Sequence, residues 1–379
     1  MTAVLALAIL SAGAWVYLAL GRGFFWRMRE RDDASPAIPQ ARHWPSVTAI
    51  VPARDESEII ERSIGSLLRQ KYAGPFNVIV VDDRSCDDTA SRARALDGSE
   101  RLTVLSGMPR PHGWTGKLWA MQQGVARATA EAVPEFFWFT DADIEHAPDT
   151  LSSLVVHAQT GYALVSLMAR LRCEALAEKA FIPAFIFFFA MLYPFAWVNK
   201  KGRTAAAAGG CMLVKRVALE AAGGLAAIRN GIIDDCALAR LLKIRGSIWL
   251  GLTDRSVSLR AYPEIPDIHR MISRSAYAQL GYSPLVLAGT IVAMLAVFVA
   301  PALLALFAQG LPQILGALAW LIMALLFQPV LRFYRLSALW GIGLPAMAAF
   351  YTAFTFDSAW QHWRGRGGMW KGRAQAMPS

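Results

Sequence analysis

Several motifs that define common enzyme classes are missing from this sequence of 379 residues. It contains no GxSxG elbow and no GxxxxGK[ST] loop, which argues against serine hydrolases and P-loop NTPases. The six histidines are scattered without HxxxH or HExxH spacing, so we expect no histidine metal site. The four cysteines form no CxxC pair and no disulfide-dense pattern, which fits a reducing compartment such as the cytoplasm.

Charged residues are scarce as well, at 17% of the chain against 55% hydrophobic residues. A mean hydropathy of +0.36 is too apolar for a purely soluble protein, so parts of the chain should face lipid. The net charge of +10 could suggest nucleic acid, but zinc-finger spacings, RNA-binding aromatic signatures and long basic runs are all absent. We therefore expect contact with the headgroups of a lipid bilayer and no nucleic-acid partner.

The N-terminal residues 1–21 are expected to form a transmembrane anchor. Met1 to Leu20 carries no charge and is long enough to cross a bilayer core. Arginines follow the apolar run instead of preceding it, and no clear cleavage site appears, so the segment reads as an uncleaved anchor. Its positive flank places the following residues in the cytoplasm.

Residues 285–356 contain three further candidate spans, Leu285 to Ala308, Leu311 to Leu331 and Leu336 to Phe356. Three crossings would leave the basic tail, residues 357–379, outside, against the positive-inside tendency. The third candidate is interrupted by GIGLP and could instead be re-entrant or lie in the membrane interface. The sequence leaves the topology of the tail open.

One apolar stretch, residues 181–197, lies in the middle of the chain and is cut by Pro183 and Pro194. A crossing there would separate the acidic motifs described below, so we expect helices that lie on the membrane surface. A buried core helix is the alternative.

Residues 45–260 are expected to form one domain. From Val47 to Asp143 strands and helices alternate in the α/β manner, which predicts a parallel sheet there. Strands are expected at VTAIVPA, NVIVVDD, LTVLS and FFWFTDAD. A helix from about Glu56 to Gln70 would place Ile60, Ile64, Leu67 and Leu68 on one face.

Acidic residues follow these strands, most clearly Asp141 and Asp143 after the apolar run FFWF. A buried strand does not tolerate charge, so the pair should mark the crevice at the carboxyl ends of the strands, where such folds bind ligands. Carboxylates suit Mg²⁺ or Mn²⁺, which could neutralise the phosphates of a nucleotide substrate. The alternative is an acidic pair that caps the next helix.

The segment GWTGK, residues 113–117, can form a close-approach loop that offers backbone N–H groups and the Lys117 cation to a phosphate. A plain surface turn is the alternative.

Taken in order, IVPARDE, VVDDRSCDDT and FTDAD resemble the inverting GT-A glycosyltransferases of family 2, over roughly Val47 to Gly251. The resemblance implies a Rossmann-like GT-A nucleotide-diphospho-sugar transferase domain and a nucleotide-sugar donor, usually a UDP-sugar. The WTGK segment looks like that of membrane-bound enzymes related to ceramide glucosyltransferase and, more closely, of hopanoid-associated ones.

The resemblance also implies roles for individual residues. Asp143, with Asp141 of the same DXD pair, would hold the metal. Asp235, beside Asp234, would be the general base that direct displacement requires. The family usually has Glu-Asp at this base motif, so Asp234 is a departure, and the pair could instead only complement a helix dipole. Gly209 and Gly210 match the acceptor-side loop. The donor-binding positions would be Pro52, Ala53, Arg54, Glu56, Asp82, Asp83, Lys117, Asp141 and Arg274.

Residues 261–284 are expected to form an interfacial helix. Processive polysaccharide synthases carry Gln-x-x-Arg-Trp at this place, whereas only Arg274 is retained here, flanked by Met271 and Ser275. Arg274 could hold the diphosphate, while loss of the aromatic residue argues against a polymer threading past the site. An interfacial helix whose arginines face headgroups is the alternative.

The sequence thus predicts an integral protein of a bacterial-type inner membrane with a cytoplasmic catalytic domain. Its expected activity is that of a hexosyltransferase moving one sugar to a membrane lipid, and the resemblance implies a hopanoid as that lipid. A processive polysaccharide synthase and a non-catalytic membrane scaffold of the same fold are the alternatives.

Overall fold

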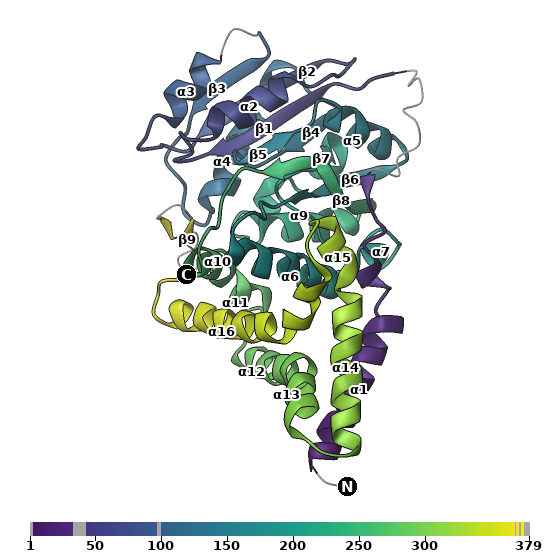
Figure 1. The fold of residues 1–379 in the computed structure, drawn as a ribbon. Coiled ribbons are helices and arrows are strands. Elements are labelled where there is room, and N and C mark those ends of the chain that lie inside the picture. Colours follow the sequence, from purple (N-terminus) through teal and green to yellow (C-terminus); the bar gives the residue numbers. More distant parts are fainter. Residues whose placement is uncertain (1–2, 33–42, 97–99, 368, 371–372, 375–379) are drawn as a thin grey trace. The chain divides into compact units, whose positions relative to one another are not determined.

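The computed structural model describes residues 3–32, 43–96, 100–367, 369–370 and 373–374. The chain divides into two compact units (Figure 1). A sheet unit comprises Glu30–Arg172, Trp197–Arg260 and Met369–Ser379, and a helical unit comprises Met1–Arg29, Cys173–Ala196 and Ala261–Gly368. Residues 173–196 therefore group with the helical unit, although they interrupt the sheet unit in sequence.

The sheet unit is built on one sheet of eight strands in the order β3-β2-β1-β4-β7-β6-β8-β5 (Figure 1). The strands are β1 (Val47–Ala53), β2 (Phe76–Asp82), β3 (Leu102–Ser106), β4 (Phe136–Phe139), β5 (Ile144–His146), β6 (Tyr162–Arg170), β7 (Met212–Lys215) and β8 (Ser247–Ser258). This confirms the predicted α/β fold and the four predicted strands.

The four predicted strands form a parallel sheet, as expected, whereas the sheet as a whole is mixed. Strands β3, β2, β1 and β4 are parallel to one another, and β6 is parallel to β8. Strand β7 runs antiparallel to both β4 and β6, and β5 runs antiparallel to β8. A strand buried on both faces is an apolar run in either direction, so its composition does not reveal its direction.

Helices pack on the two faces of the parallel half. Helix α2 (Ile60–Leu68) fully buries Ile60, Ile64 and Leu67 in the core shared with β1, as the sequence predicts. On the face that carries Ile50 lies α4 (Gly116–Glu131), where a Cβ on Gly124 would come within 2.5 Å of Ile50 Cγ2. Only glycine permits that close approach of helix to strand. The remaining helices of this unit include α3 (Thr89–Ala95), α5 (Thr150–Gln159), α8 (Arg216–Ala221) and α9 (Asp234–Lys243).

In the helical unit, α1 (Ala3–Leu20) packs along α14 (Leu311–Leu326) and against η4 (Leu295–Val299) and α13 (Ala300–Phe307), which continue α12 (Pro284–Met294) (Figure 1). Pro301 has no N–H, so the carbonyl of Val297 lacks its usual helical donor. The indole Nε1 of Trp15 donates to that carbonyl at 2.7 Å. The carbonyl oxygen that Pro301 leaves without a helical donor is thus hydrogen-bonded by a side chain of another helix.

The second layer of this unit contains α6 (Leu176–Leu192), α10 (Ile265–Ser273), α11 (Ala276–Gln279), α15 (Gln328–Phe333) and α16 (Leu344–Trp363). Helix α6 runs through Pro183 without a break and ends before Pro194, so only the second proline cuts the apolar stretch. The hydroxyl of Tyr351 in α16 donates to the carbonyl of Phe181 in α6 at 2.8 Å. The GIGLP motif, residues 341–345, lies where the 3₁₀ helix η5 (Ala338–Gly343) changes to α16, which begins at Leu344.

Five helical segments in the described residues are long and apolar enough to cross a membrane: Ala3–Leu20, Leu176–Val198, Pro284–Phe307, Leu311–Phe333 and Ala338–Trp363. The predicted N-terminal and C-terminal apolar helices are thus confirmed as helices. Which of the five cross, and on which side the tail lies, stay predictions. Within the tail, residues 368, 371–372 and 375–379 lie outside the described residues.

Candidate active site

The acidic turn after β4 is held in place by its neighbours in the sheet unit. The Thr140 hydroxyl donates to the carbonyl of Gly210 at 2.8 Å, and the Ile144 N–H donates to the carbonyl of Asp141 at 3.3 Å. Gly210 thus belongs to the site through its backbone, which fixes the start of the turn. The Asp141 carboxylate remains about one third exposed, whereas that of Asp143 is largely buried.

Lys117 connects the two acidic motifs. Its Nζ lies 2.7 Å from Oδ1 of Asp141 and 3.0 Å from Oδ2 of Asp234. The residue sits in the first turn of α4, where the Thr115 hydroxyl caps the helix by accepting from the Leu118 N–H. Burial would lower the pKa of Lys117, but the surrounding carboxylates outweigh burial and raise that pKa. Lys117 is therefore a permanent cation between the two motifs.

Asp235 is held by two backbone donors at the start of α9. Its Oδ2 accepts from the Gly209 N–H at 3.0 Å, and its Oδ1 accepts from the Cys236 N–H at 2.6 Å. Burial, reinforced by the negative charge of Asp234 and partly offset by Lys117, raises the pKa of Asp235 to about 6. A carboxylate with a raised pKa is a stronger proton acceptor than an ordinary aspartate.

Gly209 lies where the two preceding features meet. A Cβ at this position would come within 3.2 Å of Lys117 Nζ and 3.5 Å of Asp235 Oδ2. The predicted acceptor-side loop therefore borders both the cation and the candidate base.

A second cluster forms around Arg260, which the sequence analysis did not single out. Its Nε lies 2.8 Å from Oδ2 of Asp143, and its Nη2 lies 2.6 Å from Oε1 of Glu56. Arg260 follows β8 by two residues, at the end of the strand, as the predicted acidic residues follow theirs. Its position just after a strand is the one feature of the sequence that could have indicated a role for Arg260 in the site.

The third group of predicted residues lies where β1 and β2 end. The Arg54 guanidinium is buried and donates to the carbonyl of Asp83 at 2.5 Å and to that of Arg84 at 3.1 Å. Asp82 is buried, and among the described residues its Oδ1 has no hydrogen-bond partner. Pro52 and Ala53 are buried inside β1. Asp82 thus has an unused acceptor to offer a ligand, whereas Arg54 shapes the turn.

Arg274 caps the end of α10 in the helical unit, apart from the sheet unit that contains all the other predicted site residues. Its expected contact with a diphosphate stays a prediction.

The described residues contain no group of three or more His, Cys, Asp or Glu side chains arranged to hold a metal ion. The donor set at the acidic turn consists of Asp141 and Asp143. Mg²⁺ and Mn²⁺ at nucleotide sites take one or two carboxylates and complete their shell with phosphate oxygens and water. The pair therefore fits a cation that arrives with a phosphorylated ligand, and not a metal held by protein alone.

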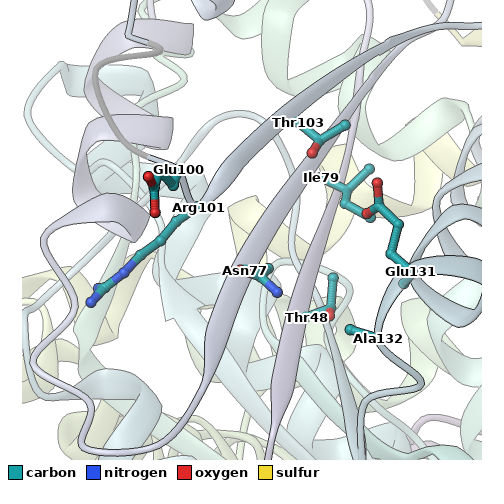
Figure 2. Close-up of a pocket in the computed structure, with 9 residues that line it drawn as sticks. Thr48, Asn77, Ile79, Glu100, Arg101, Thr103, Glu131 and Ala132 are labelled. Atoms are coloured by element: carbon teal, nitrogen blue, oxygen red, sulfur yellow. The ribbon is translucent and has the colours of Figure 1, made fainter.

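A separate cavity of about 210 Å³ lies at the opposite end of the parallel strands (Figure 2). Its lining includes Thr48 and Asn77, which stand at the beginnings of β1 and β2, together with Thr103 and Glu131. None of the predicted site residues lines it, so it is distinct from the acidic crevice.

The mixed sheet, with helices on its faces and acidic residues where its strands end, is a Rossmann-like α/β fold. Residues 48–223, slightly less than half of the chain, match the family model described as Glycosyl transferase family 2. This match supports the family 2 part of the resemblance over these residues, and the GT-A fold that the resemblance implies is confirmed.

Two groups of known proteins are similar to the chain. The 4,4'-diaponeurosporenoate glycosyltransferases of Staphylococcus aureus strains bovine RF122 / ET3-1 and USA300 are 36% and 35% identical over 100 residues. Each match covers 26% of this chain and 24% of the relative, so the chain spans about a quarter of the length of these relatives. The structure of mannosyltransferase PcManGT from Pyrobaculum calidifontis, in complex with GDP-Man and Mn2+, matches with a TM-score of 0.58 and 23% identity. That match covers 93% of this chain and 99% of the other, and it shows a shared fold.

Proposed function

We propose that the protein is a membrane-bound, inverting glycosyltransferase that moves one sugar from a nucleotide sugar, a UDP-sugar on the sequence resemblance, to a hydroxyl of a membrane lipid. The observation that carries this proposal is the position of Lys117 between Asp141 and Asp234. One cation joins the motif expected to hold the donor to the motif expected to hold the base. A single displacement needs those two groups on one site.

Asp235 is the base in this scheme. It takes the proton of the acceptor hydroxyl while that oxygen bonds to the anomeric carbon and the bond from that carbon to the diphosphate breaks. Its two backbone donors, Gly209 and Cys236, fix the carboxylate in orientation. Asp234 pairs with Lys117, which leaves Asp235 as the carboxylate that faces the proton transfer.

The donor side is assigned to the edge where β1, β2 and β4 end. The unpartnered Oδ1 of Asp82 is suited to accept a hydrogen bond from a base N–H or a ribose hydroxyl, and Asp83, Arg54 and Glu56 are assigned to the same donor side. When the donor binds, its diphosphate can compete with Asp141 and Asp234 for the ammonium group of Lys117. A Mg²⁺ or Mn²⁺ ion held by Asp143 and Asp141 would stabilise the charge that develops on the departing diphosphate. The PcManGT complex with GDP-Man and Mn2+ supports both the donor class and the metal.

A lipid acceptor is supported by the five apolar helical segments. The Staphylococcus relatives are named for 4,4'-diaponeurosporenoate and not for a polysaccharide. A hopanoid is the particular lipid that the WTGK resemblance favours. The proposal places the protein in a bacterial-type inner membrane with the sheet unit in the cytoplasm, and it gives Arg274 a role in holding the diphosphate.

The experiment that tests the acceptor is a comparison of membrane lipids by mass spectrometry. Cells that lack the protein are complemented with the wild type or with Asp235→Asn. We expect one glycolipid to be absent from the deletion strain and from the variant, and its mass to reveal sugar and acceptor together. Loss of a polymer alone would favour a processive synthase, and an unchanged glycan and lipid profile would favour a non-catalytic scaffold.

A further inference from the structure

Arg260 forms an ion pair with Asp143, the carboxylate that the proposed function assigns to the metal. Its guanidinium contacts Asp143 through Nε and Glu56 through Nη2, and both carboxylates are more buried than the arginine. The backbone holds this arrangement in register, because the Leu259 N–H donates to the carbonyl of Asp143 at 2.7 Å. On the other side, the Glu56 N–H donates to the Thr89 hydroxyl at 2.7 Å. All three side chains are therefore positioned by the ends of β1, β4 and β8.

The charges at this cluster make two states mutually exclusive. Arg260 supplies one positive charge to two carboxylates, so it cancels half of their negative charge without any ligand. A divalent cation on Asp143 would meet the guanidinium at short range in a partly desolvated site, where repulsion between like charges is strong. Asp143 thus exchanges one cation for the other and does not hold both.

The nucleoside diphosphate changes this balance. When Arg260 leaves Asp143, its planar guanidinium can donate two parallel hydrogen bonds to a phosphate group. The diphosphate thus offers Arg260 new partners in place of the carboxylate. Release of Arg260 is therefore unfavourable when the cation binds alone and favourable when the diphosphate is present.

We propose that Arg260 is a built-in competitor for Asp143 that makes binding of the divalent cation and of the donor's diphosphate cooperative. The proposal rests on the proposed function for the metal role of Asp143. Because coupling between two ligands is reciprocal, each ligand binds more tightly when the other is present, and Arg260 is the source of this coupling. The device keeps the site from holding a metal ion in the absence of donor.

The test is a titration of the full-length protein with Mn²⁺, followed by electron paramagnetic resonance of the free ion. It is carried out without nucleotide and again with saturating UDP or GDP. We expect Arg260→Gln to bind Mn²⁺ alone on the order of tenfold more tightly than the wild type, because the competing ion pair is gone. The nucleotide should then improve Mn²⁺ binding less in the variant than in the wild type.

Arg216→Gln is the matched control. This arginine pairs with Glu220 at the beginning of α8, next to the other end of β4, so the variant removes the same charge away from the site. It should match the wild type in both titrations. Arg260→Lys keeps a charge but not the fork, and we expect it to retain weak binding of Mn²⁺ alone. Its behaviour separates competition from any loss of folding in the glutamine variant.

Asp143→Asn separates failure of this inference from failure of the proposed function. Combined with Arg260→Gln it should abolish the tightened binding of Mn²⁺. If Asp143→Asn alone leaves Mn²⁺ binding with nucleotide unchanged, the metal role of Asp143 is wrong. If Asp143→Asn weakens that binding but Arg260→Gln binds Mn²⁺ no more tightly than the wild type, competition is wrong and the metal site stands.

Discussion

The ammonium group of Lys117 lies 3.0 Å from the carboxylate of Asp234, which ties the first turn of α4 to the beginning of α9. The same ammonium group also contacts Asp141 in the turn after β4. Three segments that are distant in sequence thus meet at one cation.

Lys117→Gln should reduce sugar transfer by roughly 100-fold, because the site loses the cation that faces the diphosphate and that balances the charge of Asp141 and Asp234. Initial rates at saturating acceptor, with the donor concentration varied, would measure the loss. Lys215→Gln, at an exposed lysine that ends β7, is the control and should retain the wild-type rate. Equal rates for both variants would show that Lys117 has no part in the reaction.

Gly209→Ala should slow transfer by about tenfold while the protein remains folded. The added methyl group would crowd Lys117 Nζ and contact Asp235 Oδ2. The protein should still fold, because the flexible lysine side chain can move aside more easily than backbone atoms could. Gly289→Ala, where a Cβ meets nothing within 4 Å, controls for the change of residue type. Rates and thermal unfolding midpoints of the two variants give the comparison, and an unaffected rate in Gly209→Ala would remove this loop from the site.

The pH dependence of transfer should reflect the raised pKa of Asp235. As a base it must be ionised, so the rate should rise with pH through about 6 and level off above that value. The free energy of unfolding should depend on pH in the opposite sense. The unfolded chain releases this proton at lower pH than the folded one, so Asp235 should lower the free energy of unfolding as the pH rises from about 4 to about 6.

Asp235→Asn should abolish both dependences, and denaturant unfolding at several pH values would measure the second. If the wild-type rate were flat across this pH range while chemistry limits turnover, the assignment of Asp235 as the base would fail.

Asp143→Asn should weaken donor binding only where that binding depends on metal. Isothermal titration with the nucleotide sugar, in Mn²⁺ and again in a chelator, would separate the two contributions. We expect the variant in Mn²⁺ to resemble the wild type in chelator. A variant that gains as much from Mn²⁺ as the wild type does would exclude Asp143 as the ligand.

Much of the fold could be predicted because its strands are short apolar runs that end in charge. VTAIVPA and FFWF are fully buried, and the acidic residues after them mark where the chain leaves the core. The 3.6-residue period likewise identified the buried face of α2. The direction of β7 could not be predicted, because MLVK has the same composition read in either direction.

The site was predictable where residues form motifs and not where a residue acts alone. The acidic pairs around residues 141 and 234 and the lysine of GWTGK could be recognised, and the structure brings them together. Arg260 carries no local pattern, since its importance arises only from β8 ending beside Asp143. The path of α6 through Pro183 was missed for a related reason, because tertiary packing around Phe181 and Phe187 outweighs the cost of one lost helical hydrogen bond.

The central claim is that Asp235 is the base of a single-displacement sugar transfer, and the most direct measurement is the transfer rate of Asp235→Asn together with its donor affinity. Asparagine keeps the size of the side chain but cannot accept the proton. The account predicts a fall in turnover of at least about 1,000-fold with nucleotide-sugar affinity within about threefold of the wild type. Turnover close to that of the wild type would contradict it.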